Sequence, residues 1–159
     1  MEAPTKENTL YLPIKQVYFD QIIEGTKVEE FREVKFGITA NRYLLKDGNG
    51  KYVLNPDVTD PGKEYFIDDY NNGNFPFMPK PYKYLHLAVG YAKERDTALV
   101  EVDGFRFIPN MVRANLYAFW VIAFHLGKVV EVHRKRQDYS CLNVLFLIFP
   151  LNWSEILRG

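Results

Sequence analysis

The second half of the chain alternates apolar and polar residues over long stretches, and this pattern restricts the fold to one built on a β-sheet. In residues 84–91, Leu85 and Leu87 alternate with polar or small residues, which is the period of a strand with one buried face. Residues 97–108 predict a second strand, with a bulge or bend at 103–104, where an Asp-Gly pair occurs. The KERD tetrapeptide between the two segments suits a hairpin loop, so the two strands are predicted to be neighbours.

Two more strands are predicted further along, at 119–126 and 129–133. Gly127 and Lys128 separate them, and such a pair indicates a tight hairpin turn. Residues 109–117, which precede these strands, predict a helical turn.

The first half begins with a predicted strand at 9–15, and Pro13 either places that strand at a sheet edge or ends its pairing. A helix is predicted at 16–24, where apolar residues recur on one face. That face consists of Tyr18, Phe19, Ile22 and Ile23. Gly25 follows, at the place where a helix C-terminus favours a left-handed residue.

The middle of the chain is irregular. Residues 39–45 predict either a short helix or the first arm of a hairpin, and the DGNG sequence at 47–50 is a strong turn signal. Residues 55–83 contain five prolines, and connections of this length in compact domains are usually lids or disordered segments. The aromatic residues of this connection favour a lid that packs on the domain.

The C-terminal segment 141–159 is apolar and fits three arrangements: a strand that closes the sheet, a helix docked on it, or the interface of a homodimer. Packing within the domain is the favoured arrangement. Its longest apolar run, 141–151, is too short to span a membrane and is interrupted by Asn143 and Pro150. We therefore expect a soluble protein without a membrane partner.

The charges balance, with 20 basic and 20 acidic residues and a formal net charge of zero. A protein that binds duplex DNA through its phosphates is normally basic overall, so any nucleic-acid contact here is expected to be local. The one dense basic run, at 133–136, fits a phosphate site or a solvated strand end.

Cys141 is the only cysteine, so the chain offers no internal disulfide and no thiolate metal site. This favours a reducing compartment, and the polar N-terminal residues show no signal peptide, so the expected location is cytoplasmic.

His86, His125 and His133 match no zinc spacing. No glycine-rich phosphate loop occurs, and we expect neither a metal nor a cofactor.

The segment GTKVEEFR places charge in a predicted strand. Alternate residues of a strand share a face, so Glu30 and Arg32 lie side by side, in line with Val28 and Val34. If the valines face the core, the charges do too, and burying charge is costly unless it is paired. Lys27 follows the Gly25 turn closely enough to reach the same place. The cluster fits either a structural ion pair or a site for an anionic or hydrogen-bonding ligand.

The longer segment LPIKQVYFDQIIEGTKVEEFRE resembles the start of the ASCH domain, a branch of the PUA-like superfamily. That family opens with a strand ending in lysine, a helix, and the motif G-x-K-x-x-E-x-R. Gly25, Lys27, Glu30 and Arg32 fill the four motif positions, and Lys15 matches the lysine before the helix. The segments LHLAVGYAKERDTALVEVDGF and AFWVIAFHLGKVVEV are similar to the strands that complete the family's barrel.

The resemblance implies an α+β fold: a small PUA-like mixed β-barrel of about five or six strands, with short helices closing a cleft. It covers about residues 9–133, interrupted by an insertion at about 46–83, within a single domain spanning residues 1–159. It also implies RNA binding or RNA metabolism, with the charged motif residues lining the cleft.

Some bacterial members of the family are amidohydrolases that deacetylate acetylcytidine nucleosides with a lysine, a threonine three residues later and a distal glutamate. Lys27 occupies the lysine position, but Glu30 stands where those enzymes have threonine. The stretch PNMVRANLYAF contains no acid to serve as the distal glutamate, and Glu101 is the available substitute. These departures weigh against catalysis.

The leading hypothesis is therefore that the protein binds RNA or an RNA-derived nucleotide in a cleft lined by Lys15, Lys27, Glu30 and Arg32, with Tyr91 and aromatic residues of the insertion stacking on a base. On this hypothesis, Lys27→Ala and Arg32→Ala each weaken RNA binding without unfolding the domain. One alternative is a hydrolase of acetylated cytidine nucleosides with Lys27 catalytic. Another is a protein-interaction module that uses the aromatic insertion and the apolar C-terminal segment.

Overall fold

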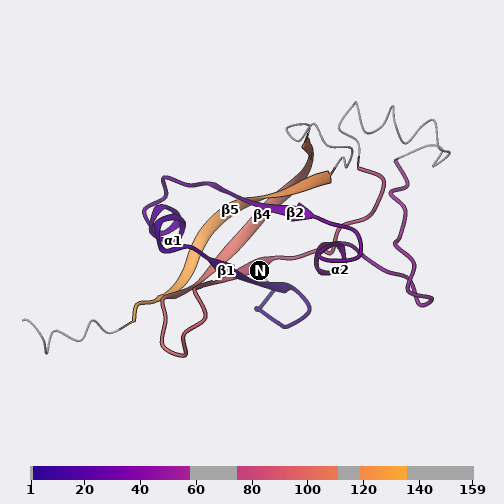
Figure 1. Cartoon of the computed structure of the whole chain (residues 1–159). Coiled ribbons are helices and arrows are strands. Elements are labelled where there is room, and N and C mark those ends of the chain that lie inside the picture. Colours follow the sequence, from indigo (N-terminus) through magenta and orange to yellow (C-terminus); the bar gives the residue numbers. More distant parts are fainter. Residues whose placement is uncertain (1, 58–74, 111–118, 136–159) are drawn as a thin grey trace, which may run out of the picture.

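A computed structural model describes residues 2–57, 75–110 and 119–135. Seven elements occur in that part of the chain (Figure 1): β1 (Thr9–Ile14), α1 (Gln16–Ile23), β2 (Glu29–Val34), α2 (Ala40–Tyr43), β3 (Tyr84–Val89), β4 (Thr97–Asn110) and β5 (Phe119–His133). The five strands form one sheet in the order β1-β3-β4-β5-β2. β1 runs parallel to β3, and the other neighbours are antiparallel.

The sheet curls into a half-barrel, with α1 and α2 near its opposite ends (Figure 1). The predicted small barrel with few short helices is consistent with this mostly-sheet architecture. Curling follows from irregular pairing in the two longest strands, β4 and β5. Their register shifts between Leu99 and Val100, between Val100 and Val102, and between Val102 and Gly104, and such bulges bend and twist a strand. The irregularity predicted at 103–104 is therefore confirmed.

The hairpin predicted at Gly127 and Lys128 is wrong. β5 continues through both residues and pairs with β4 on either side of them. Gly127 is needed for a different reason, because a Cβ atom built on it would lie 2.8 Å from Cγ of Asp103 on β4. The glycine thus permits β5 to approach the Asp103 side chain of β4 closely at the bulged part of the pair. The predicted chain reversal does not occur there.

Local signals in the first half predicted their elements well. The helix at 16–24 is α1, and Gly25 has a φ of +76° directly after it. Of the two alternatives at 39–45, the short helix is confirmed as α2. The turn at 47–50 is present, with Gly50 at a φ of +78° and the Asp47 carboxylate accepting the backbone N–H groups of Asn49 and Lys51 at 2.9 Å each.

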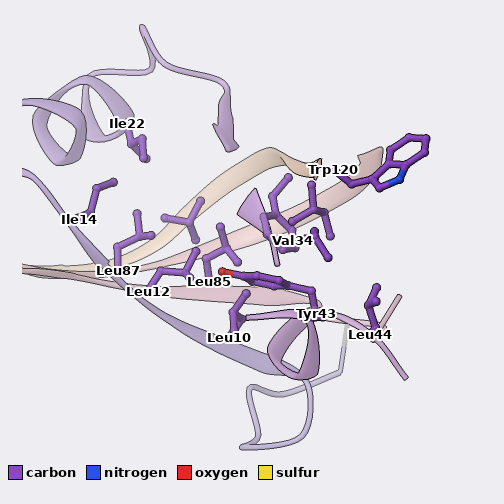
Figure 2. Packing of buried hydrophobic residues seen from close by; sticks show 14 of the residues in the cluster. Leu10, Leu12, Ile14, Ile22, Val34, Tyr43, Leu44, Leu85, Leu87 and Trp120 are labelled. Carbon is purple, nitrogen blue, oxygen red and sulfur yellow. The ribbon is translucent and has the colours of Figure 1, made fainter. Parts of the chain in front are cut away.

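The core fills the concave side of the sheet (Figure 2). Ile14, Ile22 and Leu87 pack at the end near α1, and Trp120 lies at the other end. The ring of Tyr43, from α2, lies between them and close to Leu10 and Val34 in the same view. Among the described residues, the two short helices pack on this face together with residues of the connections, such as Leu44 and Phe75.

Three predictions concern residues outside the described ranges and stay predictions. These are the helical turn at 109–117, most of which lies at 111–118, the lid at 55–83, of which 58–74 are outside the described ranges, and the apolar segment at 141–159. None of the helices in the described residues is long and apolar enough to cross a membrane.

Candidate functional site

The charged cluster predicted from GTKVEEFR forms around a buried carboxylate. Glu30 is only 3% exposed and lies on β2 opposite Phe124 of β5. Nζ of Lys27 lies 3.3 Å from one carboxylate oxygen of Glu30, and a guanidinium nitrogen of Arg32 donates to the other. The structure thus brings together Lys27, Glu30 and Arg32, which are called the Glu30 cluster below. Burying a carboxylate at this depth costs free energy unless the carboxylate is paired and hydrogen-bonded.

Strand parity explains the positions of Glu30 and Arg32. Both lie on the same side of β2 as Val34, which is buried. Val28 does not continue that face; it precedes β2 and is exposed. The chain reversal after α1 places Lys27 beside Glu30. In this reversal the backbone N–H groups of Thr26 and Lys27 both donate to the carbonyl of Gln21, at 2.9 and 3.1 Å.

Arg32 also joins the two edges of the sheet. Its Nη2 donates to the carbonyl of Pro13 on β1 at 2.9 Å, and its Nη1 donates to the carbonyl of Phe31 at 3.0 Å. β1 is an edge strand, one of the two alternatives that Pro13 predicted, and Pro13 brings no N–H to that edge. Arg42 of α2 donates to the neighbouring outward carbonyl, that of Tyr11, at 2.7 Å. Guanidinium groups therefore satisfy the edge that the sheet does not pair with backbone.

The side chains of Tyr43 and Phe124 beside the Glu30 cluster are buried. Burial raises the pKa of the Tyr43 phenol above its ordinary value, although the positive charges of Arg42 and Arg32 act in the opposite direction. The Tyr43 ring packs 6.3 Å from the ring of Phe124, the residue opposite Glu30. In this part of the site, Glu30 faces packed side chains, and a ligand would reach the cluster from its outer side.

That outer side carries two exposed aromatic rings. Nζ of Lys27 lies 5.5 Å from the ring centroid of Tyr18 and 5.2 Å from that of Phe31. Tyr18 is 44% exposed and Phe31 is 45% exposed. Tyr18, Lys27 and Phe31 are called the Lys27 surface below. A cation close to two exposed rings offers charge and stacking in one place.

Neither ring was singled out from the sequence. The helical period assigned Tyr18 to the apolar face of α1, but it lies at the rim of that face. The alternation of β2 did contain a signal for Phe31, because a residue between the inward Glu30 and Arg32 must point outward.

Lys15 and Tyr91 do not join the Glu30 cluster. Lys15 is exposed before α1, where its carbonyl accepts the backbone N–H groups of Tyr18 and Phe19 at 3.1 and 3.0 Å. Tyr91 is 87% exposed beyond the end of β3. Within the described ranges, neither side chain has a hydrogen-bonded or ionic partner. The pairing of Ile14 with Val89 puts both residues at the same end of the β1–β3 pair.

Glu101 is remote from Lys27. It pairs with Tyr84 at one end of β3, whereas Arg32 contacts β1 at Pro13, whose partner Ala88 lies toward the other end. The PNMVRANLYAF stretch falls largely outside the described residues. Lys27 itself is bound to Glu30 and donates to the carbonyl of Glu29, and a catalytic lysine that gave up its proton would lose both contacts.

A second network of charges joins α1 to the strand ends. Asp96, just before β4, accepts hydrogen bonds from Nη1 of Arg134 at 2.8 Å, Nε2 of Gln16 at 3.0 Å and the backbone N–H of Lys135 at 2.7 Å. Burial on its own raises the pKa of Asp96, but these hydrogen bonds together outweigh it and hold the pKa below its ordinary value. Arg134 also bonds Asp20 of α1, so one guanidinium holds the helix to the sheet.

We expect Asp96→Asn to destabilise the protein at pH 7, with a deficit that shrinks in acid. A carboxylate with a lowered pKa contributes stability above its unfolded-state pKa, about 3.9, and loses it as pH falls through the folded-state value. Urea unfolding midpoints at a series of pH values from 7 down to below 3 would show wild type and variant converging. Glu94→Gln, exposed in the same connection, is the control. A wild-type advantage that stays constant into acid would contradict the role given to the Asp96 charge.

The described residues contain no group of three or more His, Cys, Asp or Glu side chains placed to hold a metal ion. Comparison of the chain with protein-family models, with curated proteins and with solved structures gives no match. What the protein does therefore has to follow from its own residues and their geometry.

Proposed function

We propose that the protein binds single-stranded RNA, or a nucleotide derived from it, on the Lys27 surface of a PUA-like, ASCH-type barrel. The observation that carries this proposal is the position of the Lys27 ammonium, which lies 5.5 Å from the ring centroid of Tyr18 and 5.2 Å from that of Phe31, both exposed. Unpaired bases stack on such rings, and lysine neutralises the adjacent phosphate. The zero net charge is compatible with a local contact of this kind.

In this proposal the motif residues have different roles. Glu30 is buried and both its oxygens are engaged, so it orients Lys27 and Arg32 and is not itself offered to a base. Arg32 donates to Glu30 and to two carbonyls, and it supports the site from within the sheet. Lys27 is the motif residue that faces both exposed rings, and it is the proposed ligand contact. Lys15 and Tyr91, both exposed, would contact a ligand that extends along β1.

The test replaces one ring at a time. We expect Phe31→Ala and Tyr18→Ala each to weaken binding of an unstructured oligoribonucleotide by about 1–3 kcal/mol, the usual loss when a base loses its stacking partner. Filter binding or fluorescence anisotropy measures the affinity, and a thermal melt of each variant confirms that it is folded.

The matched control is Phe36→Ala, which removes another half-exposed phenylalanine. Phe36 packs against Tyr52 and Phe77 and has no contact with Lys27. Its loss should leave RNA affinity unchanged. The proposal fails if folded Phe31→Ala and Tyr18→Ala proteins bind as tightly as wild type.

A further inference from the structure

A hollow of about 470 Å³ lies where the β3–β4 connection meets the end of β5. It is called the basic hollow here and is lined by Lys93, Glu94, Arg95, Thr97, Arg134 and Lys135. Four of these six side chains are cationic and one is anionic. The volume falls in the usual range of small-molecule sites. Two residues of the dense basic run at 133–136, Arg134 and Lys135, therefore line a concave surface.

The fold holds the two halves of the basic hollow together. Thr97 pairs with His133, so the chain that follows β5 passes beside the chain that precedes β4. Asp96 fixes that arrangement through Arg134 and the backbone N–H of Lys135. The guanidinium of Arg134 also lies 4.9 Å from the ring of Phe19 in α1. Two lining residues, Arg134 and Lys135, are thus held in place by hydrogen bonds to Asp96.

Three of the four cations that line the basic hollow have no ion pair among the described residues, and Glu94 is the one carboxylate in the lining. Arg134 is paired with Asp20 and Asp96. Lys93, Arg95 and Lys135 have no ion pair in the part of the chain that the structure describes, and Arg95 lies 5.9 Å from the ring of Tyr11. Three cations without carboxylate partners around one hollow raise the local concentration of anions, and phosphate is the anion such groups bind well.

The basic hollow and the Lys27 surface flank the same helix. Gln16 and Asp20, one turn apart on α1, bond Asp96 and the hollow-lining Arg134, respectively. Tyr18 lies between them in sequence, on roughly the opposite side of α1, and contacts Lys27. Lys15 immediately precedes α1, which lies at one end of the sheet in Figure 1. A strand of RNA that passes the N-terminal end of α1 would therefore meet both places.

From this we infer that the basic hollow binds phosphate groups through Lys93, Arg95 and Lys135. The assignment of this phosphate to an RNA backbone rests on the proposed function above. The hollow would then take backbone phosphates that follow the base stacked on the Lys27 surface.

The first test uses inorganic pyrophosphate, which contains no base. Isothermal titration should show that wild type binds it and that Lys93→Gln/Lys135→Gln loses at least tenfold in affinity. The second test measures RNA affinity against salt concentration. Each phosphate contact contributes about 0.7 to the slope of log affinity against log salt for single strands, so the double variant should lower the slope by about 1.4.

The matched control is Lys6→Gln/Lys51→Gln, which also removes two exposed lysines. Lys6 lies near the N-terminus, before β1, and Lys51 follows the 47–50 turn, both away from the hollow. This double variant should bind pyrophosphate as tightly as wild type does. Its slope of log RNA affinity against log salt should stay within about 0.3 of the wild-type slope.

The outcomes separate the two proposals. If pyrophosphate binding depends on Lys93 and Lys135 but wild type binds no RNA, the hollow stands as a phosphate site and the proposed function fails. If wild type binds RNA and the double variant changes neither pyrophosphate affinity nor the salt slope, the hollow proposal is overturned while the proposed function survives. Failure of wild type to bind pyrophosphate, with an unchanged salt slope, also overturns it.

Discussion

Replacing Arg32 with alanine is expected to lower the free energy of unfolding by about 3 kcal/mol, the lower end of the range for removing one partner of a buried ion pair. The variant leaves the buried Glu30 carboxylate with Lys27 alone and removes the donor to the Pro13 carbonyl. The remaining Lys27 contact is the reason for choosing the lower end. Urea unfolding at pH 7, followed by circular dichroism, measures the loss.

Two further variants show whether the loss comes from the buried charge. Arg32→Ala/Glu30→Leu removes the carboxylate as well, so it should be more stable than Arg32→Ala alone. Arg106→Ala removes an arginine that pairs with Glu29 on the exposed side of β2, at 3.2 Å. An exposed pair contributes little, so this control should cost less than about 1 kcal/mol. An Arg32→Ala protein as stable as Arg106→Ala would contradict the account.

This prediction changes how the motif residues can be tested for RNA binding. Arg32→Ala was expected to weaken binding in a folded domain, but the same side chain bridges β2 and β1. A loss of binding in that variant would mix the loss of a ligand contact with the loss of the fold. The exposed rings of Tyr18 and Phe31 avoid this problem, because neither belongs to the buried core.

The elements that sequence reasoning predicted well are those specified by neighbouring residues. The apolar period of 16–24, ended by Gly25, defines α1 without help from the rest of the chain. The alternation in β3 and the turn at 47–50 are equally local. Pro13 is informative for a similar reason, since a residue without an N–H is acceptable at an edge and costly inside a sheet.

The features that were missed depend on contacts between distant residues. Gly127 was assigned to a turn because nothing near it in sequence reveals that Asp103 occupies the space beside it. Parity predicted that Glu30 and Arg32 are neighbours, but the bond from Arg32 to Pro13 exists only because the sheet curls. The basic hollow likewise needs 93–95 and 134–135 to meet at the strand ends.

The packing of α1 is the second place where a single substitution should have a large effect. Phe19 is fully buried between α1 and the sheet, and Arg134 covers its ring. We expect Phe19→Ala to cost about 3–5 kcal/mol, because the surrounding side chains cannot close the cavity that the ring leaves. Domains of this kind are stable by only about 5–15 kcal/mol, so the loss should be a large shift in the urea midpoint.

The neighbouring Val17→Ala provides the control, since Val17 lies on the same helix but is 55% exposed. It should change the free energy of unfolding by less than about 0.5 kcal/mol.

The difference between the two variants bears on function because α1 carries residues of both proposed sites. Tyr18 contacts Lys27, whereas Gln16 and Asp20 bond Asp96 and Arg134 beside the basic hollow. Below its unfolding transition, Phe19→Ala should therefore lose affinity for both RNA and pyrophosphate, whereas Val17→Ala should keep both. Equal stability of the two variants would mean that α1 is not anchored through Phe19.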